Sequence, residues 1–284
     1  MSISQDVLHS GSPEFDALLQ IPEDLIKRLS TFRDRHLIHV LQKVYISFPD
    51  ARSFLEEEVK NAMESRDHDR VQALLDSANL PLYPYHAKLE DFDPSCLNEQ
   101  DLELYQKMKT LDFLYSDCPN ITLFGPKHFG SEKLASGIGD AICRSLHSVR
   151  YTEFGRLLSI LMLHGIHSKD NTLYEELLKT DCLIIEDFAG SSIHDRDLLK
   201  ALETFLETRI KAHREAYVSA SRNPGRIKPR AAIITTCRSY EEWYQVFDCD
   251  QPVAISIISL FHGYGNILYI DETNKPKQEA AKDK

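Results

Sequence analysis

Residues 120–133 have the spacing of a phosphate-binding loop between a strand and a helix. A short apolar run, Ile121–Phe124, ends in Gly125-Pro126, and a loop closed by Gly130 leads into a helical pattern of apolar side chains. A strand, a tight glycine loop and a helix in this order place backbone N–H groups where they can hydrogen-bond phosphate oxygens. The pattern therefore indicates the frame of a nucleotide site.

Two side chains after the last glycine decide whether such a loop binds a nucleoside triphosphate. A lysine there normally reaches the β- and γ-phosphates, and a Ser or Thr next to it holds Mg²⁺. Ser131 and Glu132 occupy these two positions instead. Losing one charge pair at about 4 Å removes roughly 4 kcal/mol of attraction at an effective dielectric near 20, and Glu132 adds repulsion.

No neighbouring lysine replaces the missing one in a simple way. Lys133 lies about 200° further around the helix than Ser131, so its side chain points away. Lys127 lies within the loop and reaches the phosphates only if the loop bends unusually. We expect loss of ATP hydrolysis and weak or absent ATP binding; any remaining nucleotide contact would involve Gly125, Pro126, Lys127, Gly130, Ser131 and Glu132.

Two acids follow a second apolar run, Cys182–Ile185. Glu186 and Asp187 come about 60 residues after the glycine loop, where nucleotide-binding folds present a Mg²⁺ carboxylate and a water-activating base. The alternative is a buried strand whose acids simply emerge at its end. If the site is active, Glu186 would hold Mg²⁺ weakly and Asp187 would act as the base.

A basic segment lies between residues 211 and 230. It contains a single acid, Glu215, and Asn223-Pro224-Gly225 predicts a flexible turn in its middle. Such a segment either forms a solvated loop or contacts the phosphates of DNA or RNA. The cations in question are Lys211, Arg214, Arg222, Arg226, Lys228 and Arg230.

Two other groups of residues are interpreted as structural. His164 and His167 share a helical face but have no evident third ligand, so a metal site is not predicted there. Trp243, with Tyr240 and Phe247 at helical spacing, is interpreted as core and not as a stacking platform.

The second half of the chain alternates short apolar runs with helical patterns. Continuous apolar runs of four or five residues are typical of parallel strands buried on both faces, with crossover helices between them. This predicts an α/β domain with its ligand site at the carboxyl ends of the strands. The predicted strands are Ile121–Phe124, Val149–Thr152, Cys182–Ile185, Ala231–Thr235 and Ile267–Ile270.

The first part of the chain contains helical patterns and no strand pattern. One helix is predicted from Pro22 to a stop at Pro49, a second runs through Phe54–Met63, and a third carries Val71 and Leu75. We divide the chain into a flexible N-terminus (1–20), a helical partner-binding module (21–88), a nucleotide-binding-like core (89–273) and a disordered tail (274–284).

Composition sets the broad class. The chain has 284 residues, 42% of them hydrophobic, and a net charge of −11, which argues against a surface that grips nucleic acid over its whole extent. Six irregularly spaced cysteines indicate free thiols in a reducing compartment. Without a secretory signal or a run long enough to span a bilayer, we expect a cytoplasmic protein with no membrane contact.

Together these stretches resemble the IstB/DnaC branch of the AAA+ ATPases, the transposition helpers and helicase loaders. The resemblance covers residues 53–271, and its specificity lies in the order and spacing of the motifs. They are Leu89–Asp93 before the core, Gly125–Gly130 with Leu134-Ala135 as Walker A, Val149–Thr152, Leu183–Asp187 as Walker B, and Ile233–Arg238 with Glu242-Trp243 as sensor 1.

The chain departs from the family pattern at the positions that carry chemistry. Ser131 and Glu132 replace the Walker A lysine and the Mg²⁺-binding hydroxyl, and Phe129 replaces a loop glycine. The Walker B order Asp-Glu is inverted to Glu186-Asp187, and Cys237 takes the place of the sensor 1 asparagine. The resemblance implies a P-loop NTPase-like parallel sheet, whereas the departures predict a degenerate ATP and Mg²⁺ site.

We therefore hypothesise an assembly or regulatory subunit for a DNA-processing partner in transposition or replication. The resemblance implies a transposase, a helicase or an ATPase paralogue as that partner, docked on residues 22–78, and it allows homo-oligomers and DNA contact. One alternative is an active ATPase with an altered site, in which Glu186, Asp187 and Cys237 are catalytic. Another is a protein-interaction module with no nucleic-acid role, which the acidic composition favours.

Overall fold

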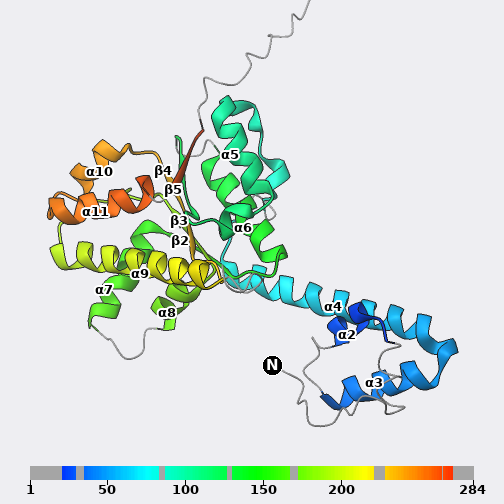
Figure 1. Ribbon diagram of the computed structural model, residues 1–284. Helices are drawn as coiled ribbons and strands as arrows, with labels where there is room; N and C mark the ends of the chain where they lie inside the picture. The colour runs from blue at the N-terminus through cyan, green and yellow to red at the C-terminus, as the bar shows by residue number, and fades with distance from the viewer. Residues whose placement is uncertain are drawn as a thin grey trace, which may run out of the picture. The chain divides into compact units, whose positions relative to one another are not determined.

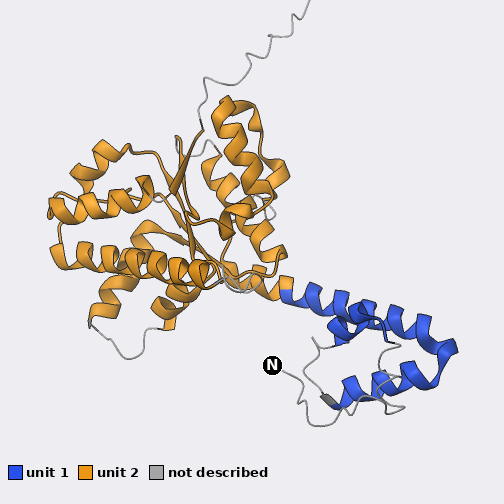
Figure 2. Cartoon of the chain, in the orientation of Figure 1, with its two compact units in different colours: residues 1–70 blue, residues 71–284 orange. Residues whose placement is uncertain are grey.

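The structure, a computed structural model, describes residues 21–29, 35–82, 87–126, 130–166, 172–220, 228–263 and 265–270. The chain forms two compact units, unit 1 (Met1–Arg70) and unit 2 (Val71–Lys284) (Figure 2). The division falls inside helix α4 (Arg52–Ala78), whereas the sequence placed the boundary after residue 88. The reason is that Leu75 and Ala78, near the end of α4, belong to the hydrophobic core of unit 2.

Unit 1 is helical, as predicted. It contains α2 (Glu23–Leu29), α3 (Arg35–Ser47), the 3₁₀ turn η2 (Pro49–Ala51) and the first part of α4. Apolar side chains from all three helices form a small core, which includes Leu25, Tyr45 and Val59. The hydroxyl of Tyr45 donates to Glu56 Oε1 at 2.6 Å and links α3 to α4.

One helix prediction in this region is corrected. Within the range from Pro22 to Pro49 that was expected as one helix, the structure describes α2 and α3, and residues 30–34 lie outside the described part of the chain. The second and third predicted helices are one continuous helix, α4. The polar run Glu64–Arg70 lies between the two predicted helices. It contains no Gly or Pro, and exposed ion pairs such as Lys60–Glu64 favour a continuous helix.

Unit 2 is built on a five-stranded parallel sheet. The strand order is β2-β3-β4-β1-β5, and every neighbouring pair is parallel. The sheet agrees with the sequence prediction, except that β5 begins and ends slightly earlier than expected. The strands are β1 (Asn120–Phe124), β2 (Val149–Glu153), β3 (Cys182–Glu186), β4 (Ala231–Thr236) and β5 (Gly265–Tyr269).

Helices cover both faces of this sheet (Figure 1). One face packs against α6 (Ser131–Arg144), with α5 (Glu99–Lys109) and the 3₁₀ turns η3 (Leu89–Asp91), η4 (Pro94–Cys96) and η5 (Asp112–Tyr115) on the same side. The other face carries α7 (Phe154–Ile166), α8 (Thr172–Lys179), α9 (Arg196–Ala220), α10 (Tyr240–Val246) and α11 (Gln251–His262). Within the described residues, no helix is long and apolar enough to cross a membrane.

The sheet register brings the candidate site residues to one edge. Phe124 at the end of β1 pairs with Thr236 at the end of β4, and Ile185 of β3 pairs with Ile234 of β4. The segments that follow these strands therefore leave the sheet side by side at its carboxyl edge, where open α/β sheets bind ligands.

Candidate functional site

The loop after β1 is held at both ends. The Gly125 N–H donates to the Thr236 carbonyl at 3.0 Å, which fixes the loop to β4. Gly130 has a φ of 120°, a backbone conformation that side-chain-bearing residues rarely adopt, and it precedes the first turn of α6. Lys127 and Phe129 lie outside the described residues.

A carboxylate of the chain itself lies in the first turn of α6. Ser131 is buried, with 2% of its surface exposed, and its hydroxyl donates to Glu132 Oε2 at 3.4 Å. Unsatisfied N–H groups and the helix dipole make the first turn of a helix favourable for an anion. In a phosphate-binding loop that anion is the ligand, whereas here Glu132 supplies a negative charge in the same turn.

The pKa of Glu186 indicates that other carboxylates lie near it. Burial raises the pKa of the Glu186 carboxyl, a hydrogen bond from Tyr151 opposes the rise, and Glu132, Glu153 and Asp187 raise it further. Carboxylates raise one another's pKa only when they lie close together. The described part of the site is therefore an acidic surface, and it disfavours both a triphosphate and additional negative charge.

Asp187 is held in an unusual turn. Its φ of 52° is left-handed, which Asp tolerates better than most side chains. Its N–H donates to the Thr235 hydroxyl at 3.1 Å, and the next N–H, of Phe188, donates to the Thr235 carbonyl at 2.8 Å. Cys237 follows β4 directly and is exposed. The structure thus places Gly125, Glu186, Asp187 and Cys237 at the same sheet edge.

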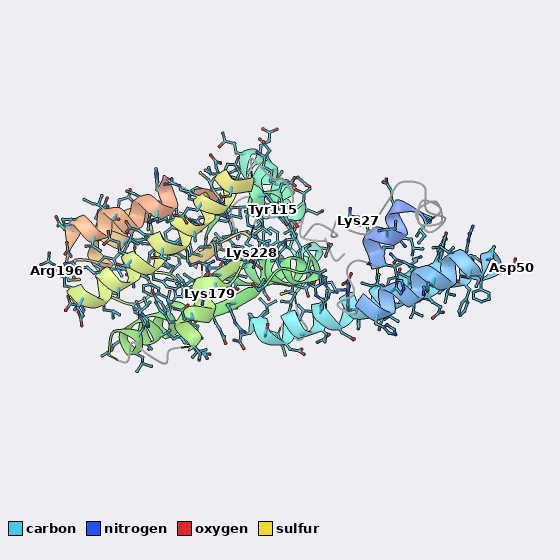
Figure 3. The ribbon with its side chains drawn as sticks, turned by 60° about the horizontal axis from the view of Figure 1, so that its bottom comes forward. Lys27, Asp50, Tyr115, Lys179, Arg196 and Lys228 are labelled. Carbon is cyan, nitrogen blue, oxygen red and sulfur yellow. The ribbon has the colours of Figure 1, made fainter. Side chains whose placement is uncertain are left out.

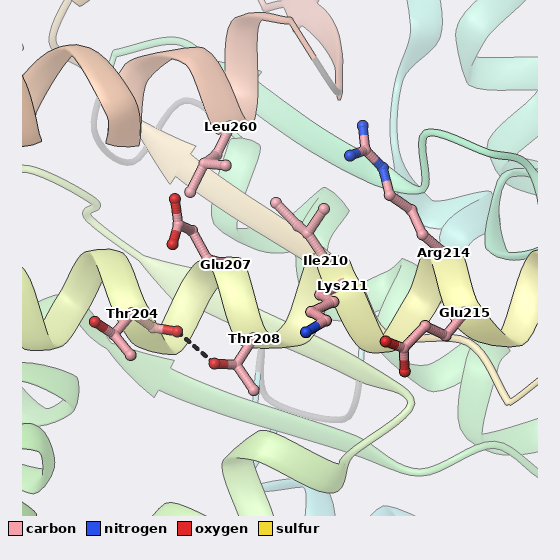
Figure 4. Close-up of a pocket in the computed structure, with 8 residues that line it drawn as sticks. All are labelled: Thr204, Glu207, Thr208, Ile210, Lys211, Arg214, Glu215 and Leu260. Carbon is pink, nitrogen blue, oxygen red and sulfur yellow. Dashed lines mark hydrogen bonds between the residues drawn. The ribbon is translucent and has the colours of Figure 1, made fainter.

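The basic residues separate into different environments. Lys211 and Arg214 are exposed on α9 and line a groove of about 490 Å³ toward Leu260 of α11 (Figure 4). Glu207 and Glu215 line the same groove, one on each side of the two cations in the sequence. Figure 3 labels Lys228, which is exposed, whereas Arg222 and Arg226 lie outside the described residues.

Arg230 is engaged inside unit 2. Its guanidinium donates to Asp181 Oδ1 at 3.1 Å, and its backbone N–H donates to His213 Nδ1 at 3.2 Å. His213 is buried and donates from Nε2 to the Ser116 carbonyl at 2.8 Å, so its neutral form bridges two loops. Arg230 therefore fixes the end of the basic segment to the body of the unit.

The Asp181 carboxylate supplies the negative charge that holds Arg230 in place. Its Oδ2 accepts from both the backbone N–H and the hydroxyl of Ser148, each at 2.9 Å. Burial would raise the pKa of the Asp181 carboxyl, but hydrogen bonds from His147 and Ser148 outweigh burial and hold the pKa below its ordinary value. The folded protein therefore favours the charged form.

Replacing Asp181 by asparagine should destabilise the fold in a pH-dependent way. A group with a lowered folded pKa contributes stability above its unfolded pKa, and this contribution is lost as pH falls through the folded pKa. We expect Asp181→Asn to lower the free energy of unfolding by about 1–3 kcal/mol at neutral pH. The difference should shrink below the ordinary Asp pKa of about 3.9. Urea unfolding at several pH values measures it, and a pH-independent difference would contradict the charge-based explanation.

Sequence reasoning missed Arg209, a fully buried cation on α9. It is 1% exposed, and burial lowers its pKa to about 9. Its position continues the buried stripe of Leu202, Phe205 and Leu206 at helical spacing. The sequence signal for a buried Arg209 is its position at the end of this apolar stripe. Its hydrogen-bond partners are backbone carbonyls, and no sequence motif identifies them.

Comparison with known proteins places this architecture in a family. The model of the IstB-like ATP binding proteins (IstB, IS21) matches residues 40–218, more than half of the chain. A putative ATP-binding protein of insertion sequence IS1162 from Pseudomonas fluorescens is 28% identical over 169 residues, covering 58% of this chain and 71% of that protein.

One solved structure shows the corresponding likeness of fold, and a second aligns with a lower TM-score. The crystal structure of DnaI aligns with a TM-score of 0.52 and 14% identity over 73% of this chain and 100% of that chain. AMPPCP-bound DnaA from Aquifex aeolicus aligns with a TM-score of 0.48 and 17% identity over 68% of this chain, which spans only about half (51%) of the DnaA chain. With its parallel sheet, glycine loop and flanking helices, unit 2 has the AAA+ P-loop NTPase-like fold, and the chain belongs to the family of IstB-like ATP-binding proteins.

Proposed function

We propose that this protein keeps the AAA+ scaffold of its family but does not hydrolyse ATP, and acts as an assembly or regulatory subunit. The observation that carries the proposal is the pair Ser131 and Glu132 at the start of α6. Ser131 supplies no charge to a phosphate, and Glu132 adds a carboxylate close to Glu186. The described residues of this site therefore do not fit Mg²⁺-bound ATP as a lysine-containing loop does.

The remaining backbone features support a scaffold role. Gly130 keeps its left-handed conformation, and Gly125 stays hydrogen-bonded to β4. The first turn of α6 has an internal carboxylate, so this helix end contains an anion without a bound nucleotide. This internal carboxylate should therefore help to stabilise the fold of unit 2 when no nucleotide is bound.

Titration with a fluorescent ATP analogue and Mg²⁺ tests this proposal. We expect weak or no saturable binding and no turnover above that of a Glu186→Gln variant. Micromolar affinity together with steady hydrolysis that Glu186→Gln abolishes would overturn it. That result would favour an active ATPase with an altered site.

The active-ATPase alternative has one specific observation in its favour. Asp187 lies in a left-handed turn that two hydrogen bonds hold to Thr235, one from the Asp187 N–H and one from the Phe188 N–H. Strained backbone of this kind is often retained where a side chain has a role. In this alternative, Glu186 would hold Mg²⁺ and Asp187 would take a proton from water.

Unit 1 is the proposed docking surface for the partner. Its described residues expose large apolar side chains on α3, on α4 and between them, an arrangement that often marks interaction sites. They are Leu37, Val40, Phe48 and Phe54, between 41% and 64% exposed. A relative from an insertion sequence makes a transposition protein one candidate partner, with a helicase or an ATPase paralogue as the others.

Contact with nucleic acid is proposed for the basic segment, in which Lys211 and Lys228 are exposed. Replacing four of its cations by alanine should weaken DNA binding and flatten its salt dependence: Lys211, Arg222, Arg226 and Lys228. Each cation that neutralises a phosphate should account for about 0.9 of the slope of log affinity against log salt on duplex DNA, and about 0.7 on single strands. Fluorescence anisotropy at several salt concentrations measures how far the slope falls in the variant.

The control for this experiment is Lys107→Ala. Lys107 is an exposed cation on α5 that pairs with Glu103 at 2.9 Å, and its removal changes the net charge without touching the basic segment. An equal loss per charge removed in the two variants would show a general charge effect. If the native protein ignores DNA even at low salt, the interaction-module alternative replaces the nucleic-acid role.

A further inference from the structure

A second pocket lies on the sheet face that carries α10 and α11, apart from the acidic site. It has a volume of about 220 Å³, and strands β1, β4 and β5 contribute residues to it together with α10 and α11. None of the carboxylates Glu132, Glu186 and Asp187 lines it. Its lining residues include Thr122, Phe124, Arg238, Tyr240, His262 and Tyr269.

Two aromatic pairs contribute to its lining. Phe124 and Tyr269, neighbours across β1 and β5, have ring centroids 5.4 Å apart. Tyr240 of α10 and His262 of α11 are likewise 5.4 Å apart, in an edge-to-face arrangement. Aromatic surfaces from opposite elements suit a flat ligand, because stacking tolerates any planar ring that fits.

The pocket also contains a hydroxyl proton that takes no part in the hydrogen bond between Tyr240 and Thr122. The Tyr240 and Thr122 hydroxyl oxygens lie 3.4 Å apart, and each hydroxyl carries one proton. Only one of these two protons can lie between the oxygens. Thr122 is 2% exposed, and neither hydroxyl has another hydrogen-bond partner among the described residues. The remaining proton and several lone pairs are therefore available to a ligand in the pocket.

A cation completes the lining. Arg238 follows β4 and is partly buried, and its Nη2 makes one long hydrogen bond, 3.5 Å, to the Gly190 carbonyl. A guanidinium has five N–H donors and matches phosphate oxygens well. The one carboxylate in the lining, Glu241, is exposed to solvent, so its charge is better screened than a buried one.

We propose that this pocket binds a nucleobase that carries a phosphate, with the base between the aromatic pairs, its polar edge on the Thr122–Tyr240 hydroxyls and its phosphate on Arg238. Planar rings, hydrogen-bonding ring edges and an anion are the features that this lining recognises together. Pockets for drug-sized ligands run from about 300 Å³ upwards, so this smaller one suits a single base. The base would come from a free nucleotide or from an unpaired strand of nucleic acid.

The protein contains its own reporter for this pocket. Trp243 is the single tryptophan of the chain. Its ring centroid lies 4.9 Å from that of Tyr240, and its Nε1–H donates to the Arg238 carbonyl at 3.1 Å. A ligand that displaces Tyr240 or Arg238 should therefore change the Trp243 emission.

The test titrates the full chain with adenosine monophosphate, adenosine and a short single-stranded oligothymidylate while Trp243 emission is recorded. We expect a saturable change with adenosine monophosphate or with the oligothymidylate. Tyr240→Phe should weaken that binding about three- to tenfold, because it removes one hydroxyl from the pocket. Arg238→Gln should weaken adenosine monophosphate at least about tenfold and leave adenosine unchanged, because only the phosphate meets the guanidinium.

Matched controls separate this pocket from the rest of the molecule. Tyr244→Phe alters an exposed tyrosine of the same helix that does not line the pocket, and should bind as the native protein does. Glu132→Gln alters the acidic site and should leave the Trp243 response unchanged. The experiment can therefore refute ligand binding in this pocket without refuting the proposed function, and the reverse also holds. Binding of the oligothymidylate alone assigns the base to a nucleic-acid strand, and binding of the monophosphate alone assigns it to a free nucleotide.

Two results would overturn the proposal. One is the absence of any saturable change in Trp243 emission with all three probes. The other is unchanged affinity in both Tyr240→Phe and Arg238→Gln, with circular dichroism and thermal unfolding showing that both variants are folded.

Discussion

Replacing Arg209 by methionine should lower the free energy of unfolding by about 3–5 kcal/mol, because four backbone carbonyls lose their donor and each buried group left unsatisfied costs about 1–3 kcal/mol. Its Nη1 donates to the carbonyls of Leu177, Leu178 and Thr180 at 2.6, 3.1 and 3.1 Å, and its Nη2 donates to Ala231 at 2.7 Å. One side chain thus ties the end of α8 to the start of β4. Methionine fills similar space but leaves these carbonyls without a donor.

Chemical unfolding of the native and variant proteins measures the effect. Arg214→Met is the matched control, because Arg214 is exposed on the same helix, and its replacement should change stability by no more than about 0.5 kcal/mol. Arg209→Lys should be intermediate, since an ammonium reaches fewer of the carbonyls. A loss below about 1 kcal/mol for Arg209→Met would show that water or relaxation satisfies these groups.

Restoring the missing side chains should create affinity for ATP. The double variant Ser131→Lys with Glu132→Thr adds one cation and removes one anion at the start of α6. Each such charge pair is worth roughly 4 kcal/mol at about 4 Å and an effective dielectric near 20. If only a third of each term is realised, each of the two changes raises the affinity about tenfold. We therefore expect Mg²⁺-ATP to bind at least about 100-fold more tightly.

The control places the added lysine at the other end of the helix. Ser145→Lys adds a lysine just after α6, about 20 Å from Ser131 at 1.5 Å per residue. Calorimetric titration of both proteins with Mg²⁺-ATP gives the comparison, after thermal unfolding has confirmed that each is folded. If the double variant binds no better than the control, Phe129 or the loop backbone blocks the site, and the two side chains are not the cause.

The sheet was predictable because its signal is local. Strands β1, β3 and β4 are buried on both faces, so their sequences are nearly continuous apolar runs, and all five strand segments were predicted without a structure. The continuity of α4 was not predicted, because a polar run in an exposed helix lacks the apolar periodicity on which the prediction relied. The interpretation of Trp243 and Phe247 as core is confirmed, since both are fully buried, whereas Tyr240, predicted with them, is only partly buried and lines a pocket.

The candidate site was predictable only in part, because only its local features leave a pattern in the sequence. Ser131 and Glu132 follow a glycine at fixed spacing, so their departure from a phosphate loop is visible in the sequence. The turn at Asp187 depends on Thr235, 48 residues later, and the hydroxyl pair of Thr122 and Tyr240 joins residues 118 apart. Contacts at such separations leave no pattern in one sequence, and only the fold brings them together.

A structure of the protein crystallised with Mg²⁺-ATP would test the degenerate site most directly. We predict no ordered triphosphate over the first turn of α6, with the carboxylate of Glu132 remaining beside Ser131. Ordered β- and γ-phosphates bound by the backbone N–H groups of residues 130–133, with Mg²⁺ on Glu186, would contradict the account.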